Sequence, residues 1–260
     1  LPILTKTVEP RGDEKELAEI TDLIGSYTTN FASSSAGRAK NVITGVSKVD
    51  GTILYPGEEF DLAKTVSPFT QENGYELAGA YQNGTVVESF GGGICQVATT
   101  LYNAVIRAEL EITMRFNHSM LVHYVEPSMD AAIAGNYKDL KFKNNLDAPV
   151  YIEGYCSGGI IYFNVYGKET RPSNREISFE SETVSKTDPK VQFTMDASLT
   201  AGSVSVTQSG QSGCIAQLWK IVKVDGKQQS RDLFNKSNYQ ATPKLITIGK
   251  KMRQARRFLL

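Results

Sequence analysis

The hydrophobic pattern changes its period along the chain, and this change constrains the fold more than any other feature of the sequence. In two segments, apolar residues recur at steps of three and four residues, which predicts helices over about 37–49 and 95–110. The residues of these two stripes are Ala39, Val42, Ile43, Val46 and Val49, then Val97, Leu101, Ala104, Val105 and Ala108. A shorter polar helix is expected over about 14–23.

After the second helix the apolar residues alternate, as they do in strands. We expect strands at 84–90, 121–125, 140–142, 150–155 and 160–166. Beyond the polar stretch Arg171–Asn174 the alternation continues without any helical pattern, through 204–206, 215–224 and 245–248. The predicted fold class is α+β: a domain whose second helix packs on an antiparallel sheet, followed by a small all-β module.

These patterns divide the chain into four parts. We place an N-terminal extension at 1–26, the α+β domain at 27–170, the β module at 175–250 and a basic tail at 251–260. Leu1 is not an initiator methionine, and the first residues lack the basic leader and long apolar stretch of a signal peptide. We therefore interpret the chain as a fragment of a longer protein, and an export signal or anchor upstream stays open.

The charge balance narrows the classes of partner. Lys plus Arg and Asp plus Glu each number 28, so the net charge is zero. This removes the main electrostatic argument for binding nucleic acid or an anionic membrane. No apolar run approaches the roughly 18–20 residues of a membrane span. We expect no nucleic-acid partner and no membrane contact from this segment itself.

Three cysteines are present, Cys95, Cys156 and Cys214, without CxxC or metal-ligand spacing. The sequence therefore predicts no metal and no cofactor. A disulfide between Cys156 and Cys214 remains open. A single cysteine is most often a small buried apolar residue.

Cys95 differs from the other cysteines in its neighbours. It follows Gly91-Gly92-Gly93-Ile94 at the expected start of the second helix. A helix N-terminus lowers a thiol pKa, to about 3.5–7.5 in reactive cases, and so favours the nucleophilic thiolate. Backbone N–H groups of Gly93 and Gln96 are candidate oxyanion donors. The competing interpretation is a glycine-rich helix entry that precedes a buried thiol.

A cysteine nucleophile needs a base, and the chain has only two histidines. His118 lies at an expected loop-to-strand junction, where active-site residues are common, whereas His123 lies inside an apolar run. We therefore predict His118 as the base. A third group should orient the imidazole. Asp130 is our candidate, ahead of Glu126, which precedes a proline, and of Asn117, which fits a structural cap.

Four further residues are candidates for substrate contact. Arg38 opens the first helix, and its guanidinium is suited to hold a carboxylate, although a solvated surface charge is the more common role. Gly92 lets the backbone approach a substrate closely. Ser119 directly follows the predicted base, and His123 lies five residues after it in the sequence.

Several motifs occur in the order and spacing of a known family. They are Thr29-Asn30-Phe31, Gly37-Arg38, Asn41, Asp50-Gly51, Pro56-Gly57-Glu58-Glu59-Phe60, Gly74-Tyr75, Gly91–Val97, Thr100–Ala104, Asn117-His118-Ser119, Tyr124–Pro127 and Asp130-Ala131. Over about 27–167 the chain resembles the VanW domain. Residues 177–249 are similar to the small G5 module that often follows it. Ala98-Thr99 and Glu126-Pro127-Ser128 depart from the usual pattern but do not touch the predicted cysteine or histidine.

The resemblance implies an extracytoplasmic protein of the Gram-positive cell envelope, in the wall or anchored to the membrane through a missing N-terminal segment. Some VanW-domain proteins are peptidoglycan L,D-transpeptidases, so it implies that Cys95 attacks a stem peptide and forms 3-3 cross-links. Two alternatives remain open. One is a cysteine peptidase or amidase acting on wall peptides, and the other is a non-catalytic binding module. The β module lacks an acid–base cluster, so we expect it to be accessory.

Overall fold

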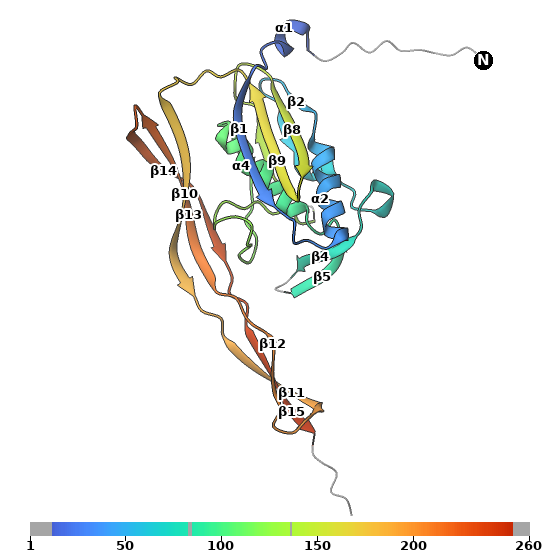
Figure 1. Ribbon diagram of the computed structural model, residues 1–260. Helices are drawn as coiled ribbons and strands as arrows, with labels where there is room; N and C mark the ends of the chain where they lie inside the picture. Colours follow the sequence, from blue (N-terminus) through green and yellow to red (C-terminus); the bar gives the residue numbers. More distant parts are fainter. Residues whose placement is uncertain (1–11, 83–84, 136, 252–260) are drawn as a thin grey trace, which may run out of the picture.

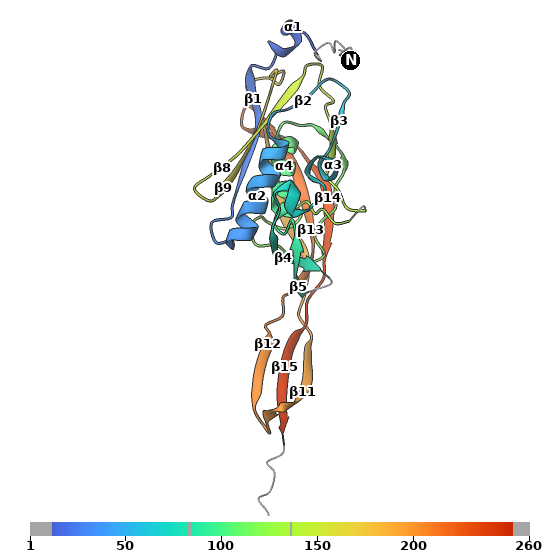
Figure 2. The same cartoon turned by 90° about the vertical axis from the view of Figure 1, so that its right-hand side faces the viewer.

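The computed structural model describes residues 12–82, 85–135 and 137–251. Residues 1–11 of the predicted extension and 252–260 of the basic tail lie outside the described residues. The described chain forms an upper α+β domain and a long, narrow β module that runs beside it and extends beyond it (Figures 1 and 2). The α+β class and the all-β C-terminal module are confirmed.

The first domain is built on a four-stranded antiparallel sheet. Its strand order is β1 (Asp22–Asn30), β9 (Ile160–Gly167), β8 (Val150–Ser157), β2 (Thr52–Leu54). A second sheet has the order β3 (Glu59–Asp61), β7 (Lys141–Lys143), β6 (Glu111–Met114), and β4 (Leu77–Gln82) pairs with β5 (Thr85–Phe90).

Two helices pack against the four-stranded sheet and against each other. α2 (Ala36–Val49) lies against β8, and α4 (Ile94–Arg107) lies against β1 and β9. α4 approaches β1 closely at Gly25, where an added Cβ would lie 2.5 Å from the Ala104 carbonyl oxygen. The α4 side chains Val97, Leu101 and Val105 are fully buried. The core thus fixes the axis and rotation of α4, and with them the position of Cys95.

Three short helices complete the domain: α1 (Glu14–Leu17), α3 (Leu62–Val66) and the 3₁₀ helix η1 (Gln71–Asn73). The helix predicted over 14–23 is wrong in its second half. Asp13 caps α1, but the chain from Asp22 onward pairs with β9. Residues 22–26 of the predicted extension therefore belong to the sheet.

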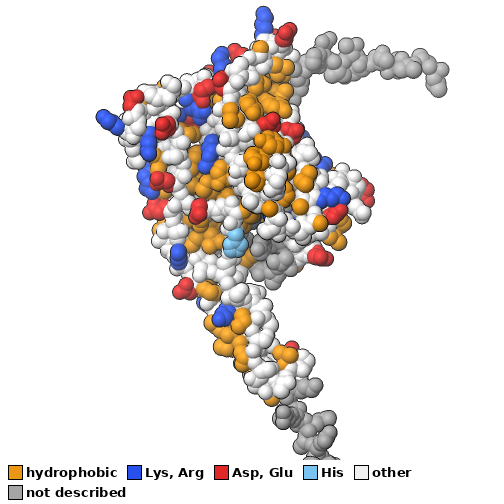
Figure 3. Space-filling model, viewed as in Figure 1, with side chains coloured by type: hydrophobic (Ala, Val, Ile, Leu, Met, Phe, Trp, Pro, Cys, Tyr) orange, Lys and Arg blue, Asp and Glu red, His pale blue; other side chains and the backbone are white. Residues whose placement is uncertain are grey.

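The C-terminal module contains two three-stranded sheets. The proximal sheet is antiparallel, and the distal sheet is mixed. The proximal sheet has the order β10 (Arg175–Thr187), β13 (Gly213–Val224), β14 (Lys227–Tyr239), and the distal sheet β11 (Val191–Thr200), β15 (Lys244–Lys251), β12 (Val204–Gln208). Leu218 of β13 is buried in the main core cluster of the first domain. Figure 3 shows exposed hydrophobic side chains on the narrow distal part, where Phe193 and Met195 project into solvent.

A further sequence prediction is wrong, and a possibility that the sequence left open is decided. Residues 121–125 form no strand, and the backbone carbonyl of Leu121 instead accepts a hydrogen bond from the Gln211 side chain at 3.1 Å. Cys156 and Cys214 are free thiols, so the possible disulfide between them is absent. In the described part of the chain, no helix is long and apolar enough to cross a membrane.

Candidate active site

Cys95 is the second residue of α4, and glycine shapes the turn that leads to it. Gly93, the residue that caps the helix, has φ 113°, a left-handed conformation that residues with a Cβ rarely adopt. The Gln96 N–H donates to the Gly93 carbonyl at 2.9 Å. The N–H groups of Gly93 and Cys95 make no hydrogen bond with any described residue. These two groups, rather than the Gln96 N–H, are therefore free to face a developing oxyanion.

One face of α4 holds the loop that carries Asp130. Cys95, Thr99 and Asn103 lie one helical turn apart. Each of them bonds the backbone of one loop residue, and these three loop residues alternate along the loop. The Asn103 side chain donates to the Met129 carbonyl at 2.6 Å. Thr99 Oγ1 donates to the Ala131 carbonyl at 3.1 Å and accepts the Ala131 N–H at 3.0 Å.

Cys95 makes the third pair of contacts on this face. Its Sγ lies 3.4 Å from both the N–H nitrogen and the carbonyl oxygen of Ile133. Four helical residues rise about 6 Å, close to the roughly 6.6 Å of two extended residues, so the two repeats stay in register. The side chain between Met129 and Ala131, that of Asp130, therefore points away from α4.

His118 lies between Cys95 and Asp130. Its Nδ1 is 2.6 Å from Asp130 Oδ2, which also accepts the His118 backbone N–H at 2.7 Å. The other ring nitrogen, Nε2, is left for Cys95, and the His118 side chain lies close enough to the thiol to lower its pKa. The geometry brings the three residues together as a thiol–imidazole–carboxylate chain. Tyr124 packs edge-on against the imidazole, with ring centroids 6.5 Å apart.

The Asp130 carboxylate is almost fully buried, and charged and polar groups surround it. Arg115 Nη2 donates to its Oδ1 at 3.0 Å, and the Tyr239 hydroxyl donates to the same oxygen. Burial raises the pKa of Asp130, but the hydrogen bond and charge of His118 and the charge of Arg115 outweigh burial and hold it below the ordinary value. The carboxylate is therefore ionised at neutral pH.

The same interactions favour a thiolate–imidazolium pair. Burial raises the pKa of the Cys95 thiol, but the hydrogen bond and charge of His118 and the Ile133 N–H outweigh burial and lower it. Burial lowers the pKa of His118, but Asp130 and Cys95 outweigh burial and raise it to about 9. Such a pair is the arrangement that activates a cysteine for nucleophilic attack.

The predicted substrate-contact residues lie around this chain without joining it. Arg38 donates to Ser34 Oγ at 2.6 Å and to Gln96 Oε1 at 2.8 Å. Gly92 is buried, and its carbonyl accepts the Asn41 amide at 3.0 Å. Ser119 and His123 are exposed. A substrate contact by any of these four residues stays a prediction.

Sequence reasoning missed several residues of this site. Arg115 lies only three residues before His118, and Thr99 and Asn103 are polar positions spaced at one turn in an apolar helix. Those signals were present in the sequence. Tyr239 lies on β14 of the C-terminal module, and no local pattern connects it with Asp130.

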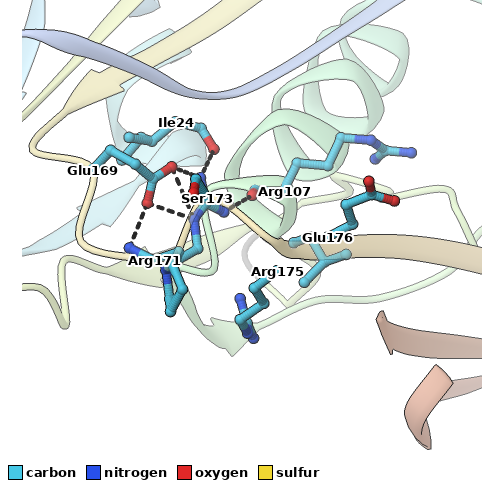
Figure 4. Close-up of a pocket in the computed structure, with 9 residues that line it drawn as sticks. Ile24, Arg107, Glu169, Arg171, Ser173, Arg175 and Glu176 are labelled. Atoms are coloured by element: carbon cyan, nitrogen blue, oxygen red, sulfur yellow. Dashed lines mark hydrogen bonds and ion pairs between the residues drawn. The ribbon is translucent and has the colours of Figure 1, made fainter. Parts of the chain in front are cut away.

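Neither a metal site nor the pocket at the junction offers a second site within the described ranges. Among the described residues, no group of three or more His, Cys, Asp and Glu side chains is placed to hold a metal. A pocket lies where the first domain meets the module (Figure 4). Its Arg171 is bound to Glu169 and to the carbonyls of Ile24 and Arg107, and Arg175 is bound to Glu109. These arginines therefore bond groups of the protein at the junction between domain and module.

Comparison with known proteins matches both the first domain and the C-terminal module to known families. The model of the VanW like protein family matches residues 37–166, half of the chain, and the model of the G5 domain matches residues 179–251. The uncharacterized protein YoaR of Bacillus subtilis (strain 168) is 35% identical over 163 residues, which cover 62% of this chain and 54% of that protein. The vancomycin B-type resistance protein VanW of Enterococcus faecalis (strain ATCC 700802 / V583) is 26% identical over 118 residues, covering 43% and 42%.

The chain thus spans about half the length of these curated relatives. Among solved structures, the IgA1 protease G5 domain is 25% identical and covers 30% of this chain and 94% of its own, with a TM-score of 0.23 that supports no argument about the fold. The predicted resemblance to a VanW domain followed by a G5-like module is confirmed. The chain belongs to the VanW-like protein family, and a G5 domain follows its VanW domain.

Proposed function

We propose that this chain is a cysteine-dependent peptidoglycan L,D-transpeptidase that acts outside the cytoplasm. The observation that carries the proposal is the Cys95–His118–Asp130 chain at the N-terminus of α4, beside two backbone N–H groups that bond no described residue. Membership in the VanW-like family supports a role in the cell envelope. One relative is named for vancomycin resistance, which agrees with that role.

The proposed first step is acylation of the thiol. The Cys95 thiolate attacks the carbonyl carbon of the third residue of a donor tetrapeptide, at the L-centre of its diamino acid. The backbone N–H groups of Gly93 and Cys95 stabilise the oxyanion that forms. The His118 imidazolium gives its proton to the departing nitrogen, D-alanine leaves, and a thioester remains.

The second step transfers the acyl group. The side-chain amine of an acceptor stem attacks the thioester carbonyl, and neutral His118 takes the proton from the amine. The C–S bond breaks, a 3-3 cross-link forms, and the thiolate–imidazolium pair is restored. Asp130 remains ionised throughout and holds Nδ1 of the imidazole.

The test uses the chain with purified disaccharide-tetrapeptides. Mass spectrometry should find an adduct on Cys95 that equals the muropeptide minus D-alanine, together with 3-3 linked dimers. Cys95→Ala should form neither. Cys156→Ala is the matched control, because burial raises the pKa of the Cys156 thiol to about 11, so that little of it is thiolate at neutral pH.

The product identifies the reaction class. An adduct followed by trimmed tripeptide monomers, without dimers, would replace transpeptidation by hydrolysis. A folded protein that binds muropeptides but never forms the adduct would instead be a binding module.

A further inference from the structure

The C-terminal module holds the loops that carry the two polar partners of Cys95. On the His118 side, the Asn117 side chain donates to the Asn238 carbonyl at 3.0 Å, and the Gln240 N–H donates to the Ser119 carbonyl at 2.7 Å. His118 therefore lies between two residues that are bonded to the module.

The loop before Asp130 is held in the same way. The Ser181 hydroxyl donates to the Pro127 carbonyl at 2.6 Å, and the Asn235 amide donates to the Ser128 carbonyl at 3.2 Å. Ser128 has φ 67°, a left-handed conformation that a non-glycine residue adopts at a cost. The bonds from the module help to hold the backbone in this conformation.

Tyr239 makes the most direct of these contacts. Its side chain is 2% exposed, and its hydroxyl accepts the Ser128 N–H at 2.7 Å and donates to Asp130 Oδ1. Burial and the charge of Asp130 raise the pKa of Tyr239 above its ordinary value, so the phenol keeps its proton and remains a donor. Ser237 adds an indirect contact, because its hydroxyl accepts Arg115 Nη1 at 2.9 Å.

We infer that the G5-like module completes the active site of the VanW domain, with Tyr239 as a positioning residue that orients the Asp130 carboxylate toward His118. This inference rests on the proposed function. It replaces the expectation from the sequence that the module is accessory. The Tyr239 side chain is buried and its hydroxyl bonds Asp130, so Tyr239 acts through Asp130.

The physical consequence follows from the order of the contacts. Without the phenol hydroxyl, Asp130 Oδ1 keeps only Arg115 as a donor, and the carboxylate loses a constraint on its rotation. The His118 imidazolium then loses part of its stabilisation, and the Cys95 thiolate in turn loses part of its counter-charge. The thiol pKa should therefore rise.

The test compares two phenol-to-phenyl changes in the full chain. Tyr239→Phe removes the hydroxyl on Asp130. Tyr75→Phe removes a hydroxyl that is also buried, one that donates to the Val66 carbonyl at 2.7 Å and does not bond Asp130. The first readout is the pH dependence of iodoacetamide alkylation at Cys95, which requires no substrate. The second is the rate of acylation by disaccharide-tetrapeptide, with melting temperature measured for both variants.

In Tyr239→Phe, half-maximal alkylation should move to higher pH by about half a unit or more. Acylation should slow about tenfold, with little change in KM, as when an outer partner of a catalytic group is lost. In Tyr75→Phe both quantities should match the wild type, although its melting temperature falls comparably. Ser237→Ala loosens Arg115 and should slow acylation about two- to threefold, and it provides the same test if Tyr239→Phe does not fold.

Equal pH profiles and equal acylation rates in all folded variants would overturn this inference and leave the proposed function intact. Another outcome would contradict the proposed function and leave this inference intact. In that case the Tyr239→Phe profile shifts as expected, but wild-type protein forms no adduct with muropeptides.

Discussion

At the residue scale, acylation needs Cys95 deprotonated and His118 protonated, so its rate depends on pH in two opposite ways. Attack needs the thiolate, which forms above a pKa lowered by His118. Release of D-alanine needs the imidazolium, which is lost above about pH 9, the pKa of His118. Acylation by a stem peptide should therefore give a bell-shaped pH profile with its upper limb near pH 9. Alkylation by iodoacetamide, which needs no acid, should rise and then stay level, and a falling limb there would contradict the assignment of the acid.

The two histidines provide a matched pair of variants for the same assignment. His118→Ala should slow acylation by about 10²–10⁴-fold, the range of general acid–base help. It should also move half-maximal alkylation upward, because burial of the thiol is then uncompensated. His123→Ala should change neither quantity much, since His123 is exposed and lies outside the thiol–imidazole–carboxylate chain. Rates within a factor of two for both variants would remove His118 from the proposed mechanism.

At the element scale, α4 holds the Asp130 loop through its polar face, and Thr99 is the central contact. Thr99→Val keeps the shape of the side chain but leaves the buried N–H and C=O of Ala131 without their partner. An unsatisfied buried group costs about 1–3 kcal/mol, and each kcal/mol lowers the melting temperature of a chain this size by roughly 2–4 °C. We expect a lower melting temperature together with slower acylation, because Asp130 is adjacent to Ala131.

Thr100→Val is the control on the same helix. Thr100 is equally buried, but its hydroxyl bonds Thr29 of β1 and the Gln96 carbonyl, away from the loop. It should lower the melting temperature without slowing acylation at a temperature where the protein is folded. If Thr100→Val slows acylation as much as Thr99→Val does, the effect is one of general stability and the register between α4 and the loop has no separate role.

The elements also show which parts of the secondary structure the sequence can predict, and why the prediction fails for others. The stripes at 37–49 and 95–110 predicted α2 and α4 within a few residues, because their apolar faces meet the sheet. Leu17, Ile20 and Leu23 have helical spacing too, yet Leu23 is in β1, where pairing with β9 supplies the backbone hydrogen bonds. The alternation at 121–125 resembles a strand, but Leu121 packs beside Cys214 and Tyr239, near the ends of β13 and β14, and the segment joins no strand ladder among the described residues.

The same contrast holds for the candidate site. Cys95, His118 and Asp130 were selected by residue type and local position, and the structure places them in contact. Tyr239 could not be selected in this way, because its contact with Asp130 depends on how the module docks on the domain. A phenol among alternating residues of a strand carries no sign of that docking.

At the scale of the whole molecule, both ends of α4 are fastened to the module. The Cys95 end is held through Asp130 and Tyr239, and the other end through Glu109, which follows the helix. The Glu109 carboxylate bonds Arg175 Nη1 at 2.6 Å and also contacts Lys220, and its side chain is only 17% exposed. Domain and module should therefore unfold as one cooperative unit at neutral pH, with Glu109 as a pH-sensitive part of their junction.

The sign of this pH dependence follows from the Glu109 carboxyl. Burial raises its pKa, but Arg175 and Lys220 outweigh burial and lower the pKa from 4.5 to about 2. A carboxyl whose pKa is lower in the folded state stabilises it above the unfolded pKa, and this contribution is lost as the pH falls through the folded pKa. The shift corresponds to at most about 3 kcal/mol of unfolding free energy near neutral pH, of which less than half remains at about pH 3.

Urea unfolding of wild type, Glu109→Gln and Glu111→Gln at a series of pH values checks this. Glu109→Gln should be less stable than wild type at pH 7. The difference should shrink as the pH falls below about 4.5, because the unfolded wild-type chain then binds a proton at Glu109 that the folded chain, with a pKa of about 2, does not. Glu111→Gln changes an exposed carboxylate two residues away and should follow the wild type throughout. A difference between Glu109→Gln and wild type that stays constant down to about pH 3 would mean that the ion pairs with Arg175 and Lys220 do not stabilise the junction.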